Sequence, residues 1–376
     1  MKRLWGQAFV DGRIQERTLI TIDGDQIAEV SVTNRPPVDS DATNDLIVPG
    51  FIDVHVHGGD GADFMDGADE AAGRVTSFHA RNGTTALAAT TLSGSRADLR
   101  DAVMSIAHAS RTQSRGAEIC GLHLEGPYIN EKRAGAQNVG AIRPADIQEI
   151  EGLHKEASHL HWIITVAPEI EGVRALIEHF RDRILFSIGH TAGDYSDAVA
   201  ALGWGASHFT HLFNAMTGMH HREPGVVGAA LVSVGATAEL IADGIHVHPA
   251  VLRVAIRALP NRVVLVTDAV RACGMPPGKY KLYEHEFVVT EDGAARLADG
   301  TLAGSTLTMN RAVQNMVELA GLPLEMVLPL ATEIPARILD IGDRKGRIAR
   351  GYDADLVVLT PKFDVERVLV RGRDTA

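Results

Sequence analysis

Six side chains that bind metals or move protons stand at the carboxyl ends of short apolar runs. They are His55, His57, Glu125, His190, His211 and Asp268. Imidazole nitrogens suit transition metals such as Zn²⁺ and Fe²⁺. A carboxylate beside a metal-activated water can take a proton and later return it. These residue types, spread over separate runs, predict a hydrolase that uses one or two divalent metals.

The first of these runs, residues 51–57, ends in a His-x-His pair. Alternation along a strand puts Asp53, His55 and His57 on one face, where two imidazoles two residues apart can chelate one metal. A polar strand end facing solvent would show the same pattern. Asp53 could orient an imidazole or be an ordinary turn residue, and the sequence leaves both readings open.

The other candidate ligands follow later runs. Glu125 stands ahead of Gly-Pro, where an acidic residue has no packing reason to be present unless it caps a loop or a helix. His190 and His211 end consecutive runs. Either residue alone would be read as a structural histidine, whereas two histidines at the same level of a barrel indicate metal ligands. Asp268 ends the last run and is our candidate general base and acid. His123 is expected to be a core or supporting histidine.

These residues must be positioned by strands, and helical patterns separate most of the strands, which predicts a parallel sheet. The expected strands span residues 46–57, 84–91, 119–125, 162–167, 184–190, 207–211, 238–241 and 263–268. When eight such strands close into a barrel, their carboxyl ends meet at one mouth, where the active site lies. We therefore predict an α/β fold with a (β/α)8 TIM-like barrel.

The two ends of the chain differ from the middle. Residues 1–48 and 346–376 contain short apolar runs and tight-turn signals such as Asp11-Gly12. Neither end can bury much by itself, so we expect both to form one small β-sandwich domain outside a barrel domain of residues 49–345. Residues 278–302 break the barrel pattern and are expected to form an inserted hairpin.

Composition narrows the class of protein. The 376 residues carry a net charge of −12, which disfavours nucleic acid as a partner. No run approaches the roughly 20 apolar residues that cross a membrane, and the first residues lack the apolar core of a signal peptide. Two cysteines offer no disulfide framework. We expect a cytoplasmic protein without a nucleic-acid or membrane partner.

Several motifs carry a resemblance to a known family over nearly the whole chain. In order, they are LIVPGFIDVHVHG, HLEGPYIN, SIGHT, HLFNAM, DGIHV and VTDA. Together they resemble the amidohydrolase superfamily and, within it, the deacetylases of amino-sugar phosphates. The activity that this resemblance implies is removal of the acetyl group from N-acetyl-D-glucosamine 6-phosphate, which gives D-glucosamine 6-phosphate and acetate. It also implies a homodimer.

The resemblance implies a role for each residue of the site. Glu125, His190 and His211 match the family's main metal site, and Asp268 matches its catalytic acid and base. The His55 and His57 pair matches a second metal site that some members have lost. Arg222 matches a residue that grips the sugar phosphate, in some cases at a neighbouring subunit's site.

Further positions match substrate-binding segments of the family. The full set expected at the substrate is Ala136, Gln137, Asn214, Ala215, His221, Arg222, Asp243, His246, Leu302, Ala303, Gly304 and Ser305. Gln137 is a departure, because well-known relatives carry a histidine there that helps to polarise the amide carbonyl. A glutamine can donate a hydrogen bond but cannot be cationic, so the resemblance does not settle its task.

Three alternatives stay open. Another amidohydrolase, such as a dihydroorotase or hydantoinase, would commonly use a modified lysine as bridging ligand, and Glu125 argues against it. A related N-acetylhexosamine-phosphate deacetylase would differ only in its sugar. A non-catalytic protein on the same barrel would be expected to have lost ligands, whereas all six are present.

Overall fold

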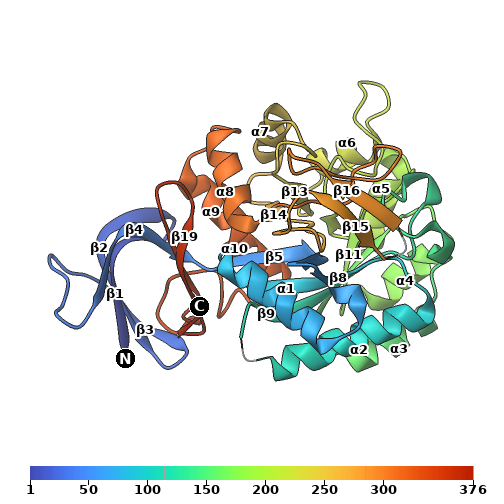
Figure 1. The fold of residues 1–376 in the computed structure, drawn as a ribbon. Coiled ribbons are helices and arrows are strands. Elements are labelled where there is room, and N and C mark those ends of the chain that lie inside the picture. Colours follow the sequence, from blue (N-terminus) through green and yellow to red (C-terminus); the bar gives the residue numbers. More distant parts are fainter. Residues whose placement is uncertain (114, 284, 376) are drawn as a thin grey trace.

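The computed structural model describes residues 1–113, 115–283 and 285–375, and its larger part is built around a parallel sheet (Figure 1). Over these residues, the sheet has eight strands, which follow one another around it in chain order. They are β5 (Phe51–Val56), β8 (Thr84–Thr91), β9 (Glu118–Glu125), β10 (His161–Val166), β11 (Leu185–Ile188), β12 (His208–Phe209), β13 (Thr237–Ile241) and β14 (Val263–Val266).

The first and last strands of this sheet meet. The backbone N–H of Asp268 donates to the carbonyl of His55 at 2.9 Å, and the N–H of His57 donates to the carbonyl of Ala269 at 2.9 Å. The sheet is therefore nearly closed, and the predicted barrel is confirmed. Closure also brings the ends of β5 and β14 together, so that residues more than two hundred positions apart become neighbours.

Helices surround the barrel and connect its strands (Figure 1). Helix α2 (Arg96–Thr112) illustrates their chemistry: Ser95 and Asp98 form a capping box at its start, and Leu99 and Val103 are among its buried residues. The other helices are α1 (Asp69–Arg81), α3 (Ile147–Glu156), α4 (Val173–Phe180), α5 (Tyr195–Trp204), α6 (Gly225–Val232), α7 (Pro249–Ala258), α8 (Met309–Glu318), α9 (Leu324–Ala331) and α10 (Glu333–Ile338). Within the described residues, no helix is long and apolar enough to cross a membrane.

The two ends of the chain form a second sheet beside the barrel, seen at the left of Figure 1. Its order is β20-β19-β18-β4-β1-β2-β3, and most neighbours are antiparallel. The edge strand β3 also bonds back to the segment before β18, because the N–H of Ile27 donates to the carbonyl of Tyr352 at 2.8 Å. The strands are β1 (Lys2–Val10), β2 (Arg13–Asp23), β3 (Gln26–Val32), β4 (Asp41–Pro49), β18 (Leu356–Leu359), β19 (Val365–Val370) and β20 (Arg373–Asp374).

This curled sheet encloses a small apolar core of its own, drawn from both ends of the chain. The expected pairing of the two ends is therefore confirmed. The domain bounds, 1–48 with 346–376 and 49–345, stay a prediction, and Ala376 lies outside the described residues.

One predicted strand, residues 46–57, is divided in the structure. Its first part belongs to β4 of the terminal sheet, and its second part is β5 of the barrel. The chain changes sheets at Pro49-Gly50, where it passes close to Thr85. A Cβ on Gly50 would lie 2.1 Å from the Thr85 hydroxyl oxygen, so only glycine fits this crossing.

The expected insertion lies after β14. It contains β15 (Gly278–Leu282), β16 (His285–Val289) and β17 (Ala295–Arg296), which form a small antiparallel sheet. Glu284, inside the predicted hairpin, lies outside the described residues. Leu282 and Phe287 pack with Leu92 and Val270, which follow barrel strands β8 and β14. The insertion thus covers part of the barrel mouth.

Candidate active site

Three of the predicted site residues sit at sharp turns where barrel strands end. The φ angles are +47° at His190, +28° at His211 and +49° at Asp268, values that side-chain-bearing residues rarely adopt. A backbone conformation of this kind is strained and costs free energy. It persists only where the surrounding structure imposes it, and such positions are common at functional sites. Here the chain turns sharply at each of the three residues, and all three side chains line one cleft.

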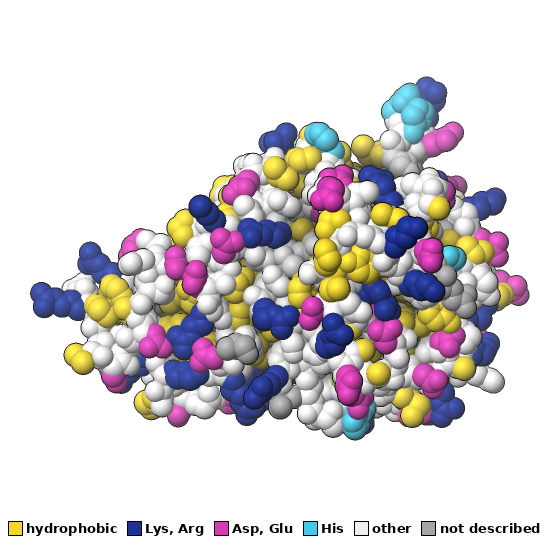
Figure 2. Space-filling model, viewed as in Figure 1, with side chains coloured by type: hydrophobic (Ala, Val, Ile, Leu, Met, Phe, Trp, Pro, Cys, Tyr) yellow, Lys and Arg dark blue, Asp and Glu magenta, His cyan; other side chains and the backbone are white. Residues whose placement is uncertain are grey.

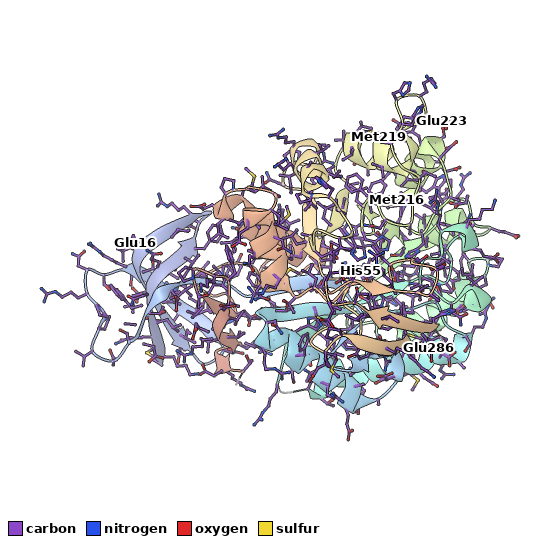
Figure 3. All side chains as sticks on the ribbon, turned by 45° about the horizontal axis from the view of Figure 1, so that its top comes forward. Glu16, His55, Met216, Met219, Glu223 and Glu286 are labelled. Atoms are coloured by element: carbon purple, nitrogen blue, oxygen red, sulfur yellow. The ribbon has the colours of Figure 1, made fainter. Side chains whose placement is uncertain are left out.

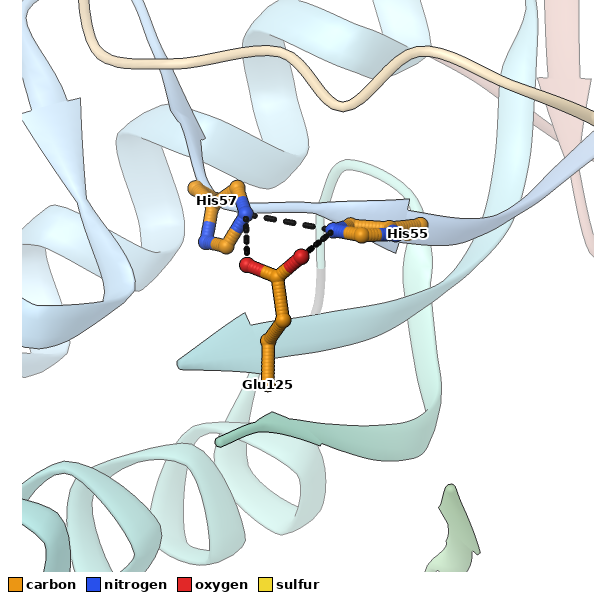
Figure 4. Close-up of side chains that lie close together, drawn as sticks. All are labelled: His55, His57 and Glu125. Atoms are coloured by element: carbon orange, nitrogen blue, oxygen red, sulfur yellow. Dashed lines mark hydrogen bonds and ion pairs between the residues drawn. The ribbon is translucent and has the colours of Figure 1, made fainter. Parts of the chain in front are cut away.

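The carboxylate of Glu125 lies at the centre of four imidazoles. Its Oε1 is 3.1 Å from Nε2 of His190 and 3.1 Å from Nε2 of His211. On the other side, Oε1 is 3.4 Å from Nε2 of His55, and Oε2 is 3.3 Å from Nε2 of His57 (Figure 4). One carboxylate thus faces two pairs of histidines, as a ligand shared by two metal ions would.

Asp268 completes this cluster. Its Oδ1 is 3.2 Å from Nε2 of His57 and 3.5 Å from Nε2 of His55. Burial opposes the ionisation of Asp268, but the charges of His55 and His57 outweigh it and lower the pKa. The structure therefore brings the six predicted residues together, with Asp268 as an ionised carboxylate that lines the cleft.

The charge balance of the cluster suits a divalent cation. Burial opposes ionisation of Glu125, yet His55 and His190 hold its pKa well below the usual range. Burial lowers the pKa of His57, but its contacts with Asp268 and Glu125 raise it to about 9. The buried carboxylates thus raise the pKa of His55, His57 and His190 and favour positive charge on these imidazoles. A bound cation would supply that charge and leave the imidazoles neutral, the form that binds metal.

Among the described residues, three groups of side chains have ligand atoms within 4.8 Å of one another, close enough to hold an ion, and all three groups are buried. Two of them share Glu125: one is His55, His57 and Glu125, and the other is Glu125, His190 and His211. The third is His55, His123 and Glu239. The residues present therefore fit a divalent metal.

Glu239, in the middle of β13, was not among the predicted site residues. It is fully buried, with Oε2 2.9 Å from Nδ1 of His55 and Oε1 3.2 Å from Nε2 of His208. The same Oε2 accepts the backbone N–H of His211 at 2.9 Å. These contacts hold His55 with its Nε2 toward the cluster. In the sequence, Glu239 could have been recognised because it is a single acidic residue inside an apolar strand.

Two further polar residues hold the barrel strands rather than the cluster. Asp53 accepts hydrogen bonds from the Thr267 hydroxyl at 2.5 Å and from the backbone N–H of His55 at 3.2 Å, so it ties β5 to the end of β14 and orients no imidazole. Burial raises its pKa to about 7. His123 bonds the carbonyl of Val54 at 3.0 Å and the hydroxyl of Thr165 at 2.7 Å, as a core histidine would.

A cleft of about 520 Å³ opens above the cluster. This volume falls in the range of small-molecule sites. The predicted substrate residues that line it are Ala136, Gln137, Asn214, Ala215, His246, Leu302 and Gly304. Two other predicted residues contact residues that line the cleft. Oδ2 of Asp243 lies 2.6 Å from Nδ1 of His246, and the N–H of Ser305 donates to the carbonyl of Asp268 at 2.8 Å. Ala303 is buried beside them.

His221 and Arg222 are not brought to this cleft by their own chain. Both are exposed, and their side chains contact each other at 2.8 Å. They belong to the loop of residues 217–224, which projects from the body of the molecule (Figure 2). In Figure 3, the labelled Met219 and Glu223 of this loop lie far from His55.

Two cations that the sequence did not single out do line the cleft. Lys132 and Arg133 lie in the 3-10 helix η2 (Glu131–Arg133), the next element after β9, and precede Gln137. A Lys-Arg pair in a polar loop looks like ordinary surface charge in a sequence. Only the position of the loop over the barrel mouth distinguishes this pair from the other exposed cations.

A barrel that gathers histidines and carboxylates at its strand ends defines the class of metal-dependent barrel hydrolases. Within that class, the chain belongs to the amidohydrolase family, whose sequence pattern matches residues 46–374.

Two of the similar proteins are named for a more specific reaction, the deacetylation of an amino-sugar 6-phosphate. The chain is 41% identical over 335 residues to N-acetylglucosamine-6-phosphate deacetylase of Bacillus subtilis, a match covering 87% of this chain and 84% of that protein. It is 38% identical over 345 residues to N-acetylgalactosamine-6-phosphate deacetylase of Escherichia coli O157:H7, covering 92% and 89%.

A solved structure supports the same comparison. N-acetyl-D-glucosamine-6-phosphate deacetylase from Mycobacterium smegmatis, in complex with N-acetyl-D-glucosamine-6-phosphate, matches with a TM-score of 0.94 and 32% identity. The match covers 100% of this chain and 99% of that one. The similarity therefore includes both the barrel and the terminal sheet.

Proposed function

We propose that this protein hydrolyses the acetamide of N-acetyl-D-glucosamine 6-phosphate, releasing D-glucosamine 6-phosphate and acetate. The observation that carries the proposal is Glu125 between two pairs of histidines, with Asp268 beside them in the lining of a cleft. Relatives named for this reaction share more than a third of their residues with the chain over most of its length. We expect the protein to act in the cytoplasm.

The residues divide the chemistry between them. The histidine pairs His55 with His57 and His190 with His211, together with Glu125, would hold the divalent metal, which would supply polarisation of the amide carbonyl and activation of water. Asp268 takes a proton from the attacking water as the oxygen bonds to the carbonyl carbon. Asp268 returns this proton to the nitrogen as the C–N bond breaks, so the amine leaves as a neutral group and the acetyl group leaves as acetic acid, which ionises to acetate. We propose two metal ions per chain, Zn²⁺ or Fe²⁺.

We also propose a homodimer in which the loop of residues 217–224 reaches the cleft of the partner. The loop projects from its own subunit and exposes 62% of Met219. Exposed Tyr195 and Val199 of α5 and Val232 of α6 provide apolar surface on helices that pack together. Arg222 would then bind the substrate phosphate from the neighbouring subunit, since its guanidinium can make two parallel hydrogen bonds. An active monomer in light scattering would contradict this arrangement.

Arg222→Ala should weaken the reaction far more on a 6-phosphorylated sugar than on the unphosphorylated one. Removing one partner of a charged pair in a dry site costs roughly 3–5 kcal/mol in transition-state binding. The measurement is kcat/KM for acetate release from both substrates, with Arg350→Ala, another exposed arginine, as the matched control. An equal decrease on the two sugars would assign Arg222 to structure rather than to the phosphate.

A panel of substrates should show the highest kcat/KM with N-acetyl-D-glucosamine 6-phosphate. The panel includes N-acetyl-D-galactosamine 6-phosphate, because one relative is named for that sugar, and both sugars without phosphate. Dihydroorotate and hydantoin test the alternative of a cyclic amidase. Turnover of the cyclic amides without release of acetate from any sugar would replace the proposed function by that alternative.

A further inference from the structure

Gln137 connects the loop over the cleft to the central carboxylate of the cluster. It lies between η2 and η3 (Val139–Ala141), and only 4% of its surface is exposed. Its side-chain Oε1 accepts the backbone N–H of Ser93 at 2.6 Å, and its Nε2 donates to Oε2 of Glu125. Because the Ser93 N–H can only donate, the amide must present its oxygen to Ser93 and its NH₂ group to Glu125.

This contact acts on the softest torsion of Glu125. Rotation of a glutamate carboxylate about its last bond has only a broad, twofold preference, so the surroundings decide the plane of the two oxygens. Oε1 faces His190 and His211, while Oε2 faces His57. The Gln137 NH₂ group, which donates to Oε2, therefore holds the carboxylate in the plane in which each oxygen faces its histidines.

The same loop also fixes a second residue of the cluster. Nδ1–H of His190 donates to the carbonyl of Arg133 at 2.7 Å, which leaves Nε2 directed at Glu125. Ser93, at the other end of the Gln137 amide, follows β8 and belongs to the barrel. The loop is thereby tied to the barrel on one side and to two predicted metal ligands on the other.

We propose that Gln137 is a positioning residue of the metal centre, which sets metal affinity by holding Glu125 in its bridging orientation through the series Ser93–Gln137–Glu125. The inference rests on the proposed metal-dependent function and assigns Gln137 a task that does not involve the substrate. A metal bound by the cluster would supply the polarisation of the substrate carbonyl, so no cationic side chain is needed at this position.

The test is Zn²⁺ affinity, measured without substrate by competition with a chelating dye. Gln137→Met keeps the length of the side chain but removes donor and acceptor, and should weaken Zn²⁺ binding by about 10–100-fold, as is usual when a ligand's supporting partner is removed. Gln137→His should restore most of the affinity, since an imidazole accepts at one nitrogen and donates at the other. Gln148→Met, the same change on the exposed surface of α3, is the matched control.

Gln137→Asn provides a second variant that keeps the amide but is one methylene too short to span Ser93 and Glu125. It should lose Zn²⁺ affinity while its circular dichroism and thermal unfolding stay native. Wild-type Zn²⁺ affinity in both Gln137→Met and Gln137→Asn would overturn the proposal, and a fall in kcat alone would place Gln137 at the substrate. Tight Zn²⁺ binding by a wild-type protein that hydrolyses no N-acetyl sugar phosphate would instead reject the proposed function.

Discussion

Asp268→Asn is expected to lower kcat by about 10²–10⁴-fold, the usual contribution of general acid and base catalysis. Asparagine keeps the shape of the side chain but cannot take a proton from water or return one to the leaving amine. Oδ1 of Asp268 lies 3.2 Å from His57 at the cleft, and its lowered pKa keeps it in the form that accepts a proton. Steady-state release of acetate measures the effect.

KM and metal content should change little in the same variant, because Glu125, His190 and His211 keep their contacts. Asp182→Asn, on the exposed surface, serves as the control. If Asp268→Asn retained a near-normal kcat with full metal content, another residue would have to be the base. His246 would be the next candidate, since it lines the cleft and is oriented by Asp243.

Replacing both His55 and His57 by asparagine is expected to lower the metal content by about one ion per chain, because two imidazole ligands are removed while the other ligands stay. Elemental analysis of the purified protein measures the content, and circular dichroism shows whether the fold is kept. Wild-type metal content in this variant would remove the pair from the metal site.

The structure makes the single variant His57→Asn a necessary companion. His55 contacts Glu239 at 2.9 Å, so its removal leaves that buried carboxylate with His208, the backbone N–H of His211 and the more distant His123 at 4.0 Å. A buried charge that has lost one of its partners destabilises the fold. Partial unfolding would then lower the metal content for a reason other than the loss of a ligand. His57 contacts Asp268 and Glu125 but not Glu239, so His57→Asn tests the pair without disturbing the Glu239 carboxylate, and thermal unfolding shows whether the fold tolerates the lost contact with Asp268. The exposed His108→Asn is the control.

The sequence by itself determined the fold class and the main candidate ligands. Each candidate follows an apolar run, and in a parallel barrel every strand delivers its carboxyl end to the same mouth. The position of His190 or His211 in the cluster therefore follows from its place at a strand end and needs no knowledge of its neighbours. The pairing of the two chain ends was also predictable, because neither end could bury its apolar residues alone.

Only the tertiary structure decided which partners these residues have. Alternation puts Glu239 on the inner face of its strand, but barrel closure brings it to His55. Likewise, the family resemblance marked Gln137 as a departure, and the path of its loop over the barrel mouth decided that its amide bonds Ser93 and Glu125. The physical reason is that a strand's period fixes the direction of a side chain locally. The groups it meets depend on packing and loop paths between segments far apart in the chain.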